Sequence, residues 1–484
     1  MGKNTNHLRE KADELFRQEK FNEIIELLTD NVLKNQSDPG LYVQRGNARY
    51  NNNDYNGAIK DYDEAIAIDS GYELAFYNRG LSWFVKKEYD KAIEDYNKAI
   101  KLYPNYEFYL NRGYAWKAKE EYTEAINDYT KAIEIKPDFE NAYYSRGLAK
   151  KEGKIDMEGS KQDFQKYLEL TADENGAWTN YAKYYIEVLD IRINDKELSD
   201  IIDIVDAIKN ILCINEDCVT HYTSLSTLKK LIFDNNKFRM SEGNFMNDPL
   251  EGNEFFNFLQ FSIFDRGSSF LENFSSKPFI GCFVTKDKHN DLNMWRFYGK
   301  ENGKEAKGCA ITLRMQNFID AIKDSISTEK NKDARLDDES DIKFYRVVYV
   351  IQNNPTKFYI PDSDKSKELE DRMKDLKGKV NSYKGDNKTF LEKCLNDIAF
   401  LFKNNAYKNE NEVRLVVKGI GLPKKCDLNT DSPNVYIELT SIKDIVEQIT
   451  LGPKVDSKNE WKLAFRYSYE EKAPKIVISN LPYK

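Results

Sequence analysis

The sequence predicts an α-helical repeat solenoid followed by an α+β domain with a mixed central sheet. Two observations carry this prediction. A pattern built on an aromatic residue, two variable positions, Arg and Gly recurs about every 34 residues in the first third of the chain. Beyond residue 216, short runs rich in β-branched and aromatic residues alternate with helical segments. With 484 residues the chain is too long for one compact core, so we expect two domains.

The composition is that of a protein that folds and stays in water. Hydrophobic residues make up 40% of the chain and charged residues 32%. The N-terminus lacks an apolar signal core and no run approaches the length of a membrane span, so we expect a cytoplasmic protein with no membrane partner. A net charge of -8 does not indicate a nucleic-acid partner, although nucleic acid stays open as an acceptor substrate.

The cysteines do not form a metal-binding pattern. There are six, with no CxxC spacing, and none stands at zinc-ligand spacing from one of the three histidines. We therefore expect reduced, buried thiols and no metal site.

Four in-phase copies define the repeat, with glycines 34, 33 and 34 residues apart at Gly46, Gly80, Gly113 and Gly147. Beyond each of the first three glycines comes an alanine, followed by DYDEAI, DYNKAI or DYTKAI. Large aromatic residues suit the space between two antiparallel helices, and small residues suit their close approach. The fourth copy aligns at Asp163 and Phe164 only if one residue is inserted, as suits the end of an array. This period resembles the tetratricopeptide repeat.

The domain boundaries follow from where the period starts and stops. We assign residues 1–38 to a divergent N-terminal repeat, 39–172 to the tetratricopeptide array, 173–216 to two connecting helices and 217–484 to the C-terminal domain. Neither a Gly/Ser-rich nor a Pro-rich linker separates the halves, which predicts a rigid connection.

The resemblance to tetratricopeptide arrays implies a protein or peptide partner bound in the concave groove. The residue that precedes each repeat arginine matches the groove-facing column of such arrays: Gln44, Asn78, Asn111 and Ser145. The alternative is that these four are ordinary solvated polar side chains.

The second half predicts six strands and a long helical segment. The strands are expected at Phe279 to Thr285, Gly308 to Leu313, Phe344 to Val350, Glu412 to Val417, Asn434 to Leu439 and Lys475 to Ser479. Residues 376–402 are expected to be helical, and the charge-rich stretches 328–341 and 361–374 to be loops or solvated helix faces.

The second half also resembles the bacterial family known as domain of unknown function 2971. The matching pieces are HYTS at 221–224, MNDPLE at 246–251, CF at 282–283, MWRFYG at 294–299, GCAITL at 308–313, NENEVRLV at 409–416 and ITLGPKV at 449–455.

A further resemblance is to ADP-ribosyltransferases of the His-Tyr-Glu type, with His221, Tyr298 and Glu412 in the three catalytic positions. It implies NAD as the cofactor. His221 would bind the ribose and the carboxamide edge, Tyr298 would stack on nicotinamide, and Glu412 would stabilise an oxocarbenium-like transition state. The remaining NAD-binding positions would be Tyr222, Thr223, Ser224, Asn247, Asp248 and Arg414.

Structural interpretations stand beside these roles. His221 could be a strand histidine satisfied by a backbone carbonyl. The Asn247-Asp248-Pro249 run is good turn chemistry, with Glu251 capping a helix. Glu412 and Arg414 alternate on one strand face and could form only an ion pair, with Glu410 competing for any catalytic role.

Three functions follow from these interpretations. The first is a bacterial intracellular effector whose array binds a protein partner and whose C-terminal domain is an NAD-dependent ADP-ribosyltransferase-like enzyme, acting in toxin biology or phage defence. The second is a non-enzymatic adaptor with two recognition domains. The third is a hydrolase or metal-dependent nuclease that uses Asp248, Glu251 and Glu412.

Overall fold

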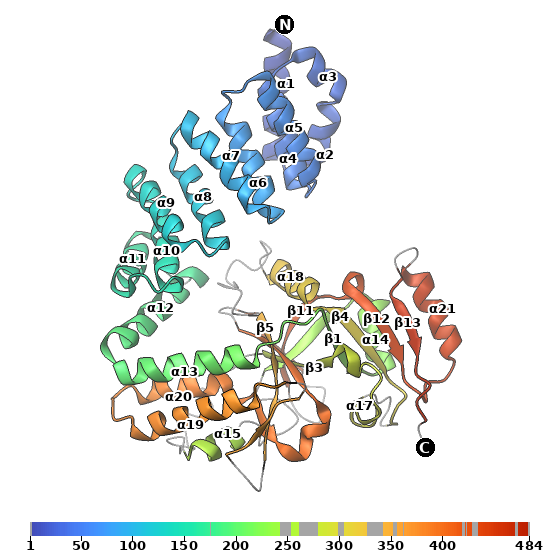
Figure 1. Ribbon diagram of the computed structural model, residues 1–484. Coiled ribbons are helices and arrows are strands. Elements are labelled where there is room, and N and C mark those ends of the chain that lie inside the picture. Colours follow the sequence, from blue (N-terminus) through green and yellow to red (C-terminus); the bar gives the residue numbers. More distant parts are fainter. Residues whose placement is uncertain are drawn as a thin grey trace. The chain divides into compact units, whose positions relative to one another are not determined.

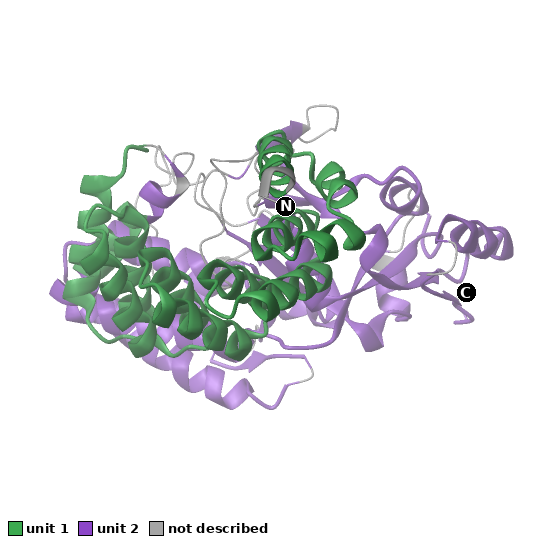
Figure 2. Cartoon of the chain, turned by 90° about the horizontal axis from the view of Figure 1, so that it is seen from above, with its two compact units in different colours: residues 1–174, 182–190 green, residues 175–181, 191–484 purple. Residues whose placement is uncertain are grey.

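The computed structural model describes residues 2–174, 176–242, 253–260, 279–298, 304–326, 342–351, 356–361, 363–418, 422, 424–427, 434–469 and 473–482. The chain separates into two compact units (Figure 2). Unit 1 comprises residues 1–174 and 182–190, and unit 2 comprises residues 175–181 and 191–484. None of the helices in these described ranges is both long and apolar enough to cross a membrane.

Unit 1 is helical throughout its described residues, as the repeat period predicts (Figure 1). Its helices are α1 (Gly2–Arg17), α2 (Phe21–Leu27), α3 (Asp30–Gln36), α4 (Pro39–Asn51), α5 (Tyr55–Ile68), α6 (Glu73–Val85), α7 (Tyr89–Leu102), α8 (Tyr106–Ala118), α9 (Tyr122–Ile135), α10 (Glu140–Glu152), α11 (Met157–Leu170) and the middle of α12 (Ala177–Asn194). Consecutive helices from α4 to α11 pack in pairs, and each pair packs on the next.

Each repeat arginine binds an aspartate of the following helix through two side-chain hydrogen bonds. The pairs are Arg45 with Asp61, Arg79 with Asp95, Arg112 with Asp128 and Arg146 with Asp163. The aspartate lies 16 residues after the arginine in the first three pairs and 17 in the fourth, where the sequence predicts one inserted residue. Bidentate charge-assisted bonds of this kind fix geometry as well as adding energy.

The repeat glycines face the aromatic ring of the paired helix. A Cβ atom on Gly46 would lie 2.5 Å from Cε1 of Tyr62, and Gly113 stands in the same relation to Tyr129. The rings are buried, so an added methyl group has no free space. In the fourth pair a phenylalanine replaces the tyrosine, and the corresponding distance relaxes to 3.2 Å.

Unit 2 combines helices with a mixed sheet, as predicted (Figure 1). Its helices are α13 (Lys196–Leu212), α14 (Leu225–Ile232), α15 (Asn253–Leu259), α17 (Leu292–Phe297), α18 (Met315–Ile326), α19 (Ser366–Ser382), α20 (Lys388–Ala399) and α21 (Lys458–Tyr469), with 3-10 turns η3 (Lys286–Lys288), η6 (Asn405–Glu410) and η7 (Lys443–Ile445). Its strands are β1 (Cys218–Thr223), β2 (Lys237–Glu242), β3 (Phe279–Thr285), β4 (Cys309–Arg314), β5 (Ile342–Arg346), β6 (Val348–Val350), β7 (Phe358–Tyr359), β8 (Phe402–Asn404), β9 (Val413–Val417), β10 (Lys424–Asp427), β11 (Asn434–Ser441), β12 (Val446–Leu451) and β13 (Lys475–Ile478).

The main sheet has ten strands and branches at β3. Along one path the order is β10-β11-β2-β3-β1-β4-β12-β13, while β9 pairs with β3 and β5 pairs with β9. Among the described strand pairs of this sheet, β12 and β13 run parallel and the others are antiparallel. A separate small sheet has the order β7-β6-β8. The branch brings β1, β3 and β9 together, although they are far apart in the sequence.

The two faces of the main sheet are covered by different helices. Leu228 of α14, Phe318 of α18 and Phe465 of α21 belong to the main apolar core on one face. On the other face Trp295 of α17 is fully buried beside Tyr222 of β1, and the two rings meet edge to face with centroids 4.8 Å apart. Trp295, part of the MWRFYG motif, is therefore a core residue.

Helix α13 packs against both α19 and α20, and the three form a helical layer within unit 2. Asp397 of α20 ties this layer together, because its carboxylate contacts Lys209 of α13 at 3.3 Å and Lys418 after β9 at 2.7 Å. Burial opposes the charge on Asp397, but the two ammonium groups outweigh it and lower the pKa of this carboxyl group.

Two sequence predictions need correction. The helical segment expected at residues 376–402 is two helices, α19 and α20, separated at residues 383–387, and Phe402 already belongs to β8. The stretch 361–374, expected to be loop or solvated helix face, does contain the start of α19, which also buries Leu369 and Met373. Not all thiols are buried, since Cys426 on β10 is exposed.

Candidate functional site

The candidate site lies where β1 and β3 separate. Their ladder ends at the pair Thr220 and Val284, although β1 continues beside β4. Just past that point Nδ1 of His221 lies 2.9 Å from the carbonyl oxygen of Cys282. A carbonyl oxygen only accepts hydrogen bonds, so in the neutral ring Nδ1 carries the hydrogen and Nε2 keeps its lone pair.

The surroundings of His221 favour its neutral form. The rings of Phe238 and Phe283 lie 5.2 and 5.4 Å from the imidazole, centroid to centroid. Burial lowers the pKa of His221, and the bond to the Cys282 carbonyl offsets only part of that effect. The ring is therefore suited to accept a hydrogen bond at Nε2 near pH 7.

Glu412, directly before β9, is the centre of a buried ionic cluster. Its Oε1 accepts a hydrogen bond from Nε of Arg414 at 2.8 Å, and its Oε2 accepts one from Nζ of Lys403 at 2.8 Å. The same Nζ donates to Oε2 of Glu410 at 2.9 Å. Two carboxylates and two cations thus balance in formal charge, as a buried cluster requires. The predicted ion pair between Glu412 and Arg414 is confirmed.

Burial and the charges of the ionic cluster together set the protonation of Lys403, Tyr298 and Cys282. Burial opposes the charge on Lys403, but Glu412 and Glu410 outweigh it and raise the pKa of its ammonium group. Burial, followed by the charge of Glu412, raises the pKa of both the Tyr298 phenol and the Cys282 thiol. Both groups therefore stay protonated near neutral pH, and Cys282 is a poor nucleophile.

His221, Tyr298 and Glu412 line one cavity, with a volume of about 50 Å³. Its other lining residues are Thr220, Tyr222, Cys282, Phe283, Met294 and Glu410. A cavity of this size holds a water molecule or a small functional group. Sites for whole small molecules are larger, roughly 300 to 1,000 Å³. The three side chains meet, but the space between them does not accommodate a dinucleotide.

His221 and Glu412 reach the cavity from opposite faces of the sheet. Side chains alternate along a strand, and His221 shares the face of the main apolar core with Phe283. The neighbours of Arg414 within β9 also face that core, so Arg414 and the Glu412 that it binds face α17. The gap between β1 and β3 lets the two side chains approach the same space.

The other predicted NAD-binding residues have structural contacts. Tyr222 donates from its hydroxyl to the carbonyl oxygen of Lys288 at 2.6 Å and lines the cavity. Ser224 is the N-cap of α14, where its Oγ accepts from the N–H of Thr227 at 3.0 Å. The carbonyl oxygen of Thr223 accepts from the Cys309 thiol.

The remaining predicted positions are either engaged inside the protein or outside the described residues. Arg414 is fully buried and also donates to the carbonyl oxygen of Phe400, so its guanidinium is engaged inside the protein. Asn247, Asp248 and Glu251 lie outside the described residues. Within the described part of the chain, no group of three or more His, Cys, Asp or Glu side chains could hold a metal ion.

Sequence reasoning missed Lys403. It lies on β8, a strand that falls at the end of a segment read as helical, so nothing placed its ammonium group near Glu412. The NENE run did contain a usable signal: two glutamates two residues apart beside a buried strand require cations nearby. Cys282 was noted only as part of a family motif.

The predicted groove column makes contacts inside unit 1. The side chain of Gln44 donates to Oδ1 of Asp13 at 2.6 Å, and that of Asn78 donates to Oδ1 of Asn47 at 3.1 Å. The last two members of the column bond tyrosine hydroxyls: Asn111 donates to Tyr77 at 2.9 Å, and Ser145 donates to Tyr114 at 3.3 Å. These donors already join neighbouring repeats, so a bound peptide has to use the remaining acceptors or replace these bonds.

Family models match both halves of the chain. A model described as "Tetratricopeptide repeat" matches residues 74–106, and one described as "TPR repeat" matches residues 46–84 and 113–152. A third, "Protein of unknown function (DUF2971)", matches residues 294–415. This range includes Tyr298, Lys403 and Glu412 but not His221. Among curated proteins, none matches this chain.

Solved structures resemble the repeat array. The MamA protein is 28% identical, with 36% of this chain and 95% of that chain covered and a TM-score of 0.32. The Arabidopsis OM64 TPR domain is 26% identical, with 24% and 95% covered and a TM-score of 0.23. YrrB, described as a TPR protein with an unusual peptide-binding site, is 22% identical, with 36% and 89% covered and a TM-score of 0.31. The chain thus carries tetratricopeptide repeats within residues 46–152 and a region of the DUF2971 family at residues 294–415.

Proposed function

We propose that this protein is a two-part effector whose repeat array binds a protein or peptide partner and whose C-terminal domain transfers ADP-ribose from NAD. Tetratricopeptide repeats suggest protein–protein interaction, which supports the first half. The observation that carries the second half is the meeting of His221, Tyr298 and Glu412 around one cavity. A bacterial toxin or phage-defence effector, silent until its partner docks, is the setting that this pairing suits.

Each of the three side chains has chemistry that fits the nicotinamide–ribose bond. The carboxylate of Glu412 would stabilise positive charge that develops on the ribose as nicotinamide leaves. Neutral His221 would accept a hydrogen bond from a ribose hydroxyl at Nε2, and the Tyr298 ring would stack on nicotinamide. The acceptor nucleophile would then bond to the ribose carbon and lose a proton.

Lys403 is the group that has to move for this reaction. Its Nζ binds Glu410 and Glu412, the two carboxylates that line the cavity, and the cavity is too small for the substrate. In our proposal, displacement of Lys403 frees one oxygen of Glu412 while Arg414 keeps the carboxylate oriented. Partner docking on the array would favour the displaced state.

Nicotinamide release from NAD by the full chain tests the proposal. In the Lys403→Met background, which should need no partner, we expect Glu412→Gln, which keeps size and removes charge, to lower the rate by at least about 100-fold. Glu368→Gln, on the exposed face of α19, is the matched control and should leave the rate unchanged. Lys403→Met should raise the rate without a partner. If the wild type and Lys403→Met both release nicotinamide only at the background rate, the transferase is ruled out.

The second candidate is a non-enzymatic adaptor. The observation that favours it is that Glu412 is 4% exposed and already bound by two cations, as a structural carboxylate would be. An adaptor predicts equal background NAD turnover in all these variants and retention of the same bound partner by the wild type and Glu412→Gln. The transferase predicts a difference in turnover.

A further inference from the structure

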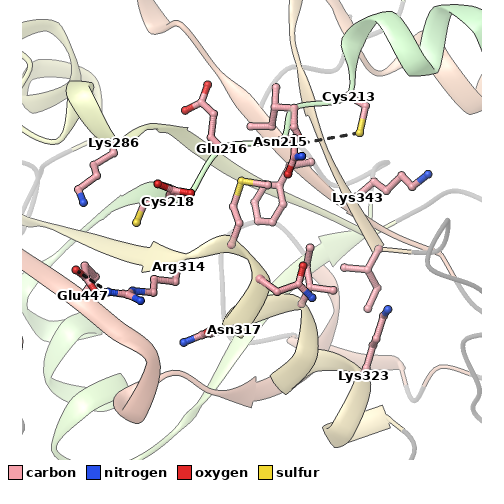
Figure 3. A pocket seen from close by; sticks show the side chains of 17 residues that line it. Cys213, Asn215, Glu216, Cys218, Lys286, Arg314, Asn317, Lys323, Lys343 and Glu447 are labelled. Atoms are coloured by element: carbon pink, nitrogen blue, oxygen red, sulfur yellow. Dashed lines mark hydrogen bonds and ion pairs between the residues drawn. The ribbon is translucent and has the colours of Figure 1, made fainter. Parts of the chain in front are cut away.

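A second and much larger pocket lies beside the segment that connects α13 to β1. Figure 3 shows its lining side chains, which surround a volume of about 730 Å³. They come from residues 213–218, η3, the β4–α18 junction, β5 and β12. All these elements belong to unit 2, and the volume falls within the roughly 300 to 1,000 Å³ that is usual for small-molecule sites. His221, Tyr298 and Glu412 do not line it.

Cationic side chains stand on two sides of this pocket. Lys286 and Arg314 lie on one side and Lys323 and Lys343 on the other (Figure 3). Arg314 is held by Glu447, with Nε and Oε2 2.8 Å apart. Within the described residues, Lys286 and Lys343 have no ion-pair partner.

The carboxylates of the lining reduce this positive charge only in part. Glu447 is bound to Arg314, and Glu216 is bound to Arg346 outside the pocket at 2.7 Å. Asp217 is the third carboxylate and is exposed. The lining therefore keeps unpaired positive charge in a chain whose net charge is -8. α18 also begins at the pocket without an acidic residue in its first turn, which favours a bound anion over a cation.

The rest of the lining is apolar or carries amides, which a small inorganic anion would not use. Ile214, Met315, Ile319 and Phe344 supply apolar surface. Asn215 and Asn317 add side-chain amides that can bond hydroxyl and ring nitrogen groups. A ligand that uses the whole pocket therefore combines negative charge, polar groups and an apolar body.

We propose that this pocket binds a nucleoside phosphate. Its phosphates would lie between Lys286 and Lys343, its ribose hydroxyls would bond the asparagine amides and the free carboxylate, and its base would cover the apolar lining. The proposal does not depend on the NAD chemistry proposed for the Glu412 cavity, because the two pockets share no lining residue.

Calorimetric titration of the full chain with ADP at low ionic strength tests this inference. We expect saturable binding that weakens at least about tenfold when Lys286→Gln and Lys343→Gln are combined, since each removes a phosphate contact. The matched control combines Lys229→Gln and Lys230→Gln, two exposed positions on α14 that do not line the pocket. Thermal unfolding of each variant checks that the fold is retained.

Adenosine and pyrophosphate separate the two halves of the ligand. Adenosine should bind at least about tenfold more weakly than ADP, because it lacks the charge that the lysines attract. Pyrophosphate should also bind more weakly, because it leaves the apolar lining exposed. The inference is overturned by an absence of ADP binding, by equal ADP affinity in the lysine variants and the wild type, or by pyrophosphate binding as tightly as ADP.

Discussion

Replacing Lys403 with methionine removes the cation shared by two buried carboxylates. Its Nζ lies 2.9 Å from Glu410 and 2.8 Å from Glu412, and all three side chains are at most 10% exposed. Removing one partner of a buried ion pair costs about 3 to 5 kcal/mol. Arg414 still binds Glu412 after the substitution, so we expect the lower end, about 3 kcal/mol.

Hydrogen exchange of the β9 amides measures the loss of stability beside the Lys403 cluster. It does not assume that the two units unfold together. A loss of about 3 kcal/mol corresponds to exchange that is faster by roughly 100-fold, at tenfold for each 1.4 kcal/mol. Lys408→Met, an exposed lysine of η6, is the matched control. Adding Glu410→Gln to Lys403→Met should recover at least about 1 kcal/mol, because it removes an unpaired charge. Unchanged β9 exchange in Lys403→Met would refute the account of this cluster.

Two further substitutions, each away from the candidate site, test the packing of unit 1 and a buried charge cluster of unit 2. Gly113→Ala places Cβ 2.5 Å from the ring of Tyr129 and should destabilise unit 1 by about 1 to 3 kcal/mol. Gly378→Ala is the control, because its Cβ meets nothing within 4 Å and the change should be neutral or stabilising. Thermal melts followed by circular dichroism compare the two variants. Asp397→Asn should cost about 1 to 2 kcal/mol at pH 7, as measured by urea denaturation. Because folding lowers the pKa of Asp397, its contribution is present above about pH 4, the unfolded value, and is lost as pH falls, so the difference between variant and wild type should shrink in acid.

The repeat array could be predicted because one local rule recurs. Glycine, alanine and aromatic positions return with the same period, and each copy is an independent sample of the same packing. The Arg45 and Asp61 pairing was available from the same pattern, since an aspartate follows each repeat arginine at a near-constant distance. The period alone does not show that these two side chains meet, because that depends on how the paired helices face each other.

The candidate site could be predicted only in part. The resemblance to a transferase family brought together His221, Tyr298 and Glu412, which do line one cavity. The resemblance could not show that His221 and Glu412 approach the cavity from opposite faces of the sheet. Those faces depend on the order and register of β1, β3 and β9. Lys403 was out of reach for the same reason, since a short parallel pairing of β8 with β6 positions it.

The most direct test of the central claim is whether NAD reaches His221. The chain has three histidines, His7, His221 and His289, so selective nitrogen-15 labelling gives a simple imidazole spectrum. In Lys403→Met without ligand we predict that His221 is neutral with hydrogen on Nδ1, and that NAD shifts its Nε2 signal while the His7 signal stays in place. A His221 signal that does not move when NAD is added to this variant would contradict the account.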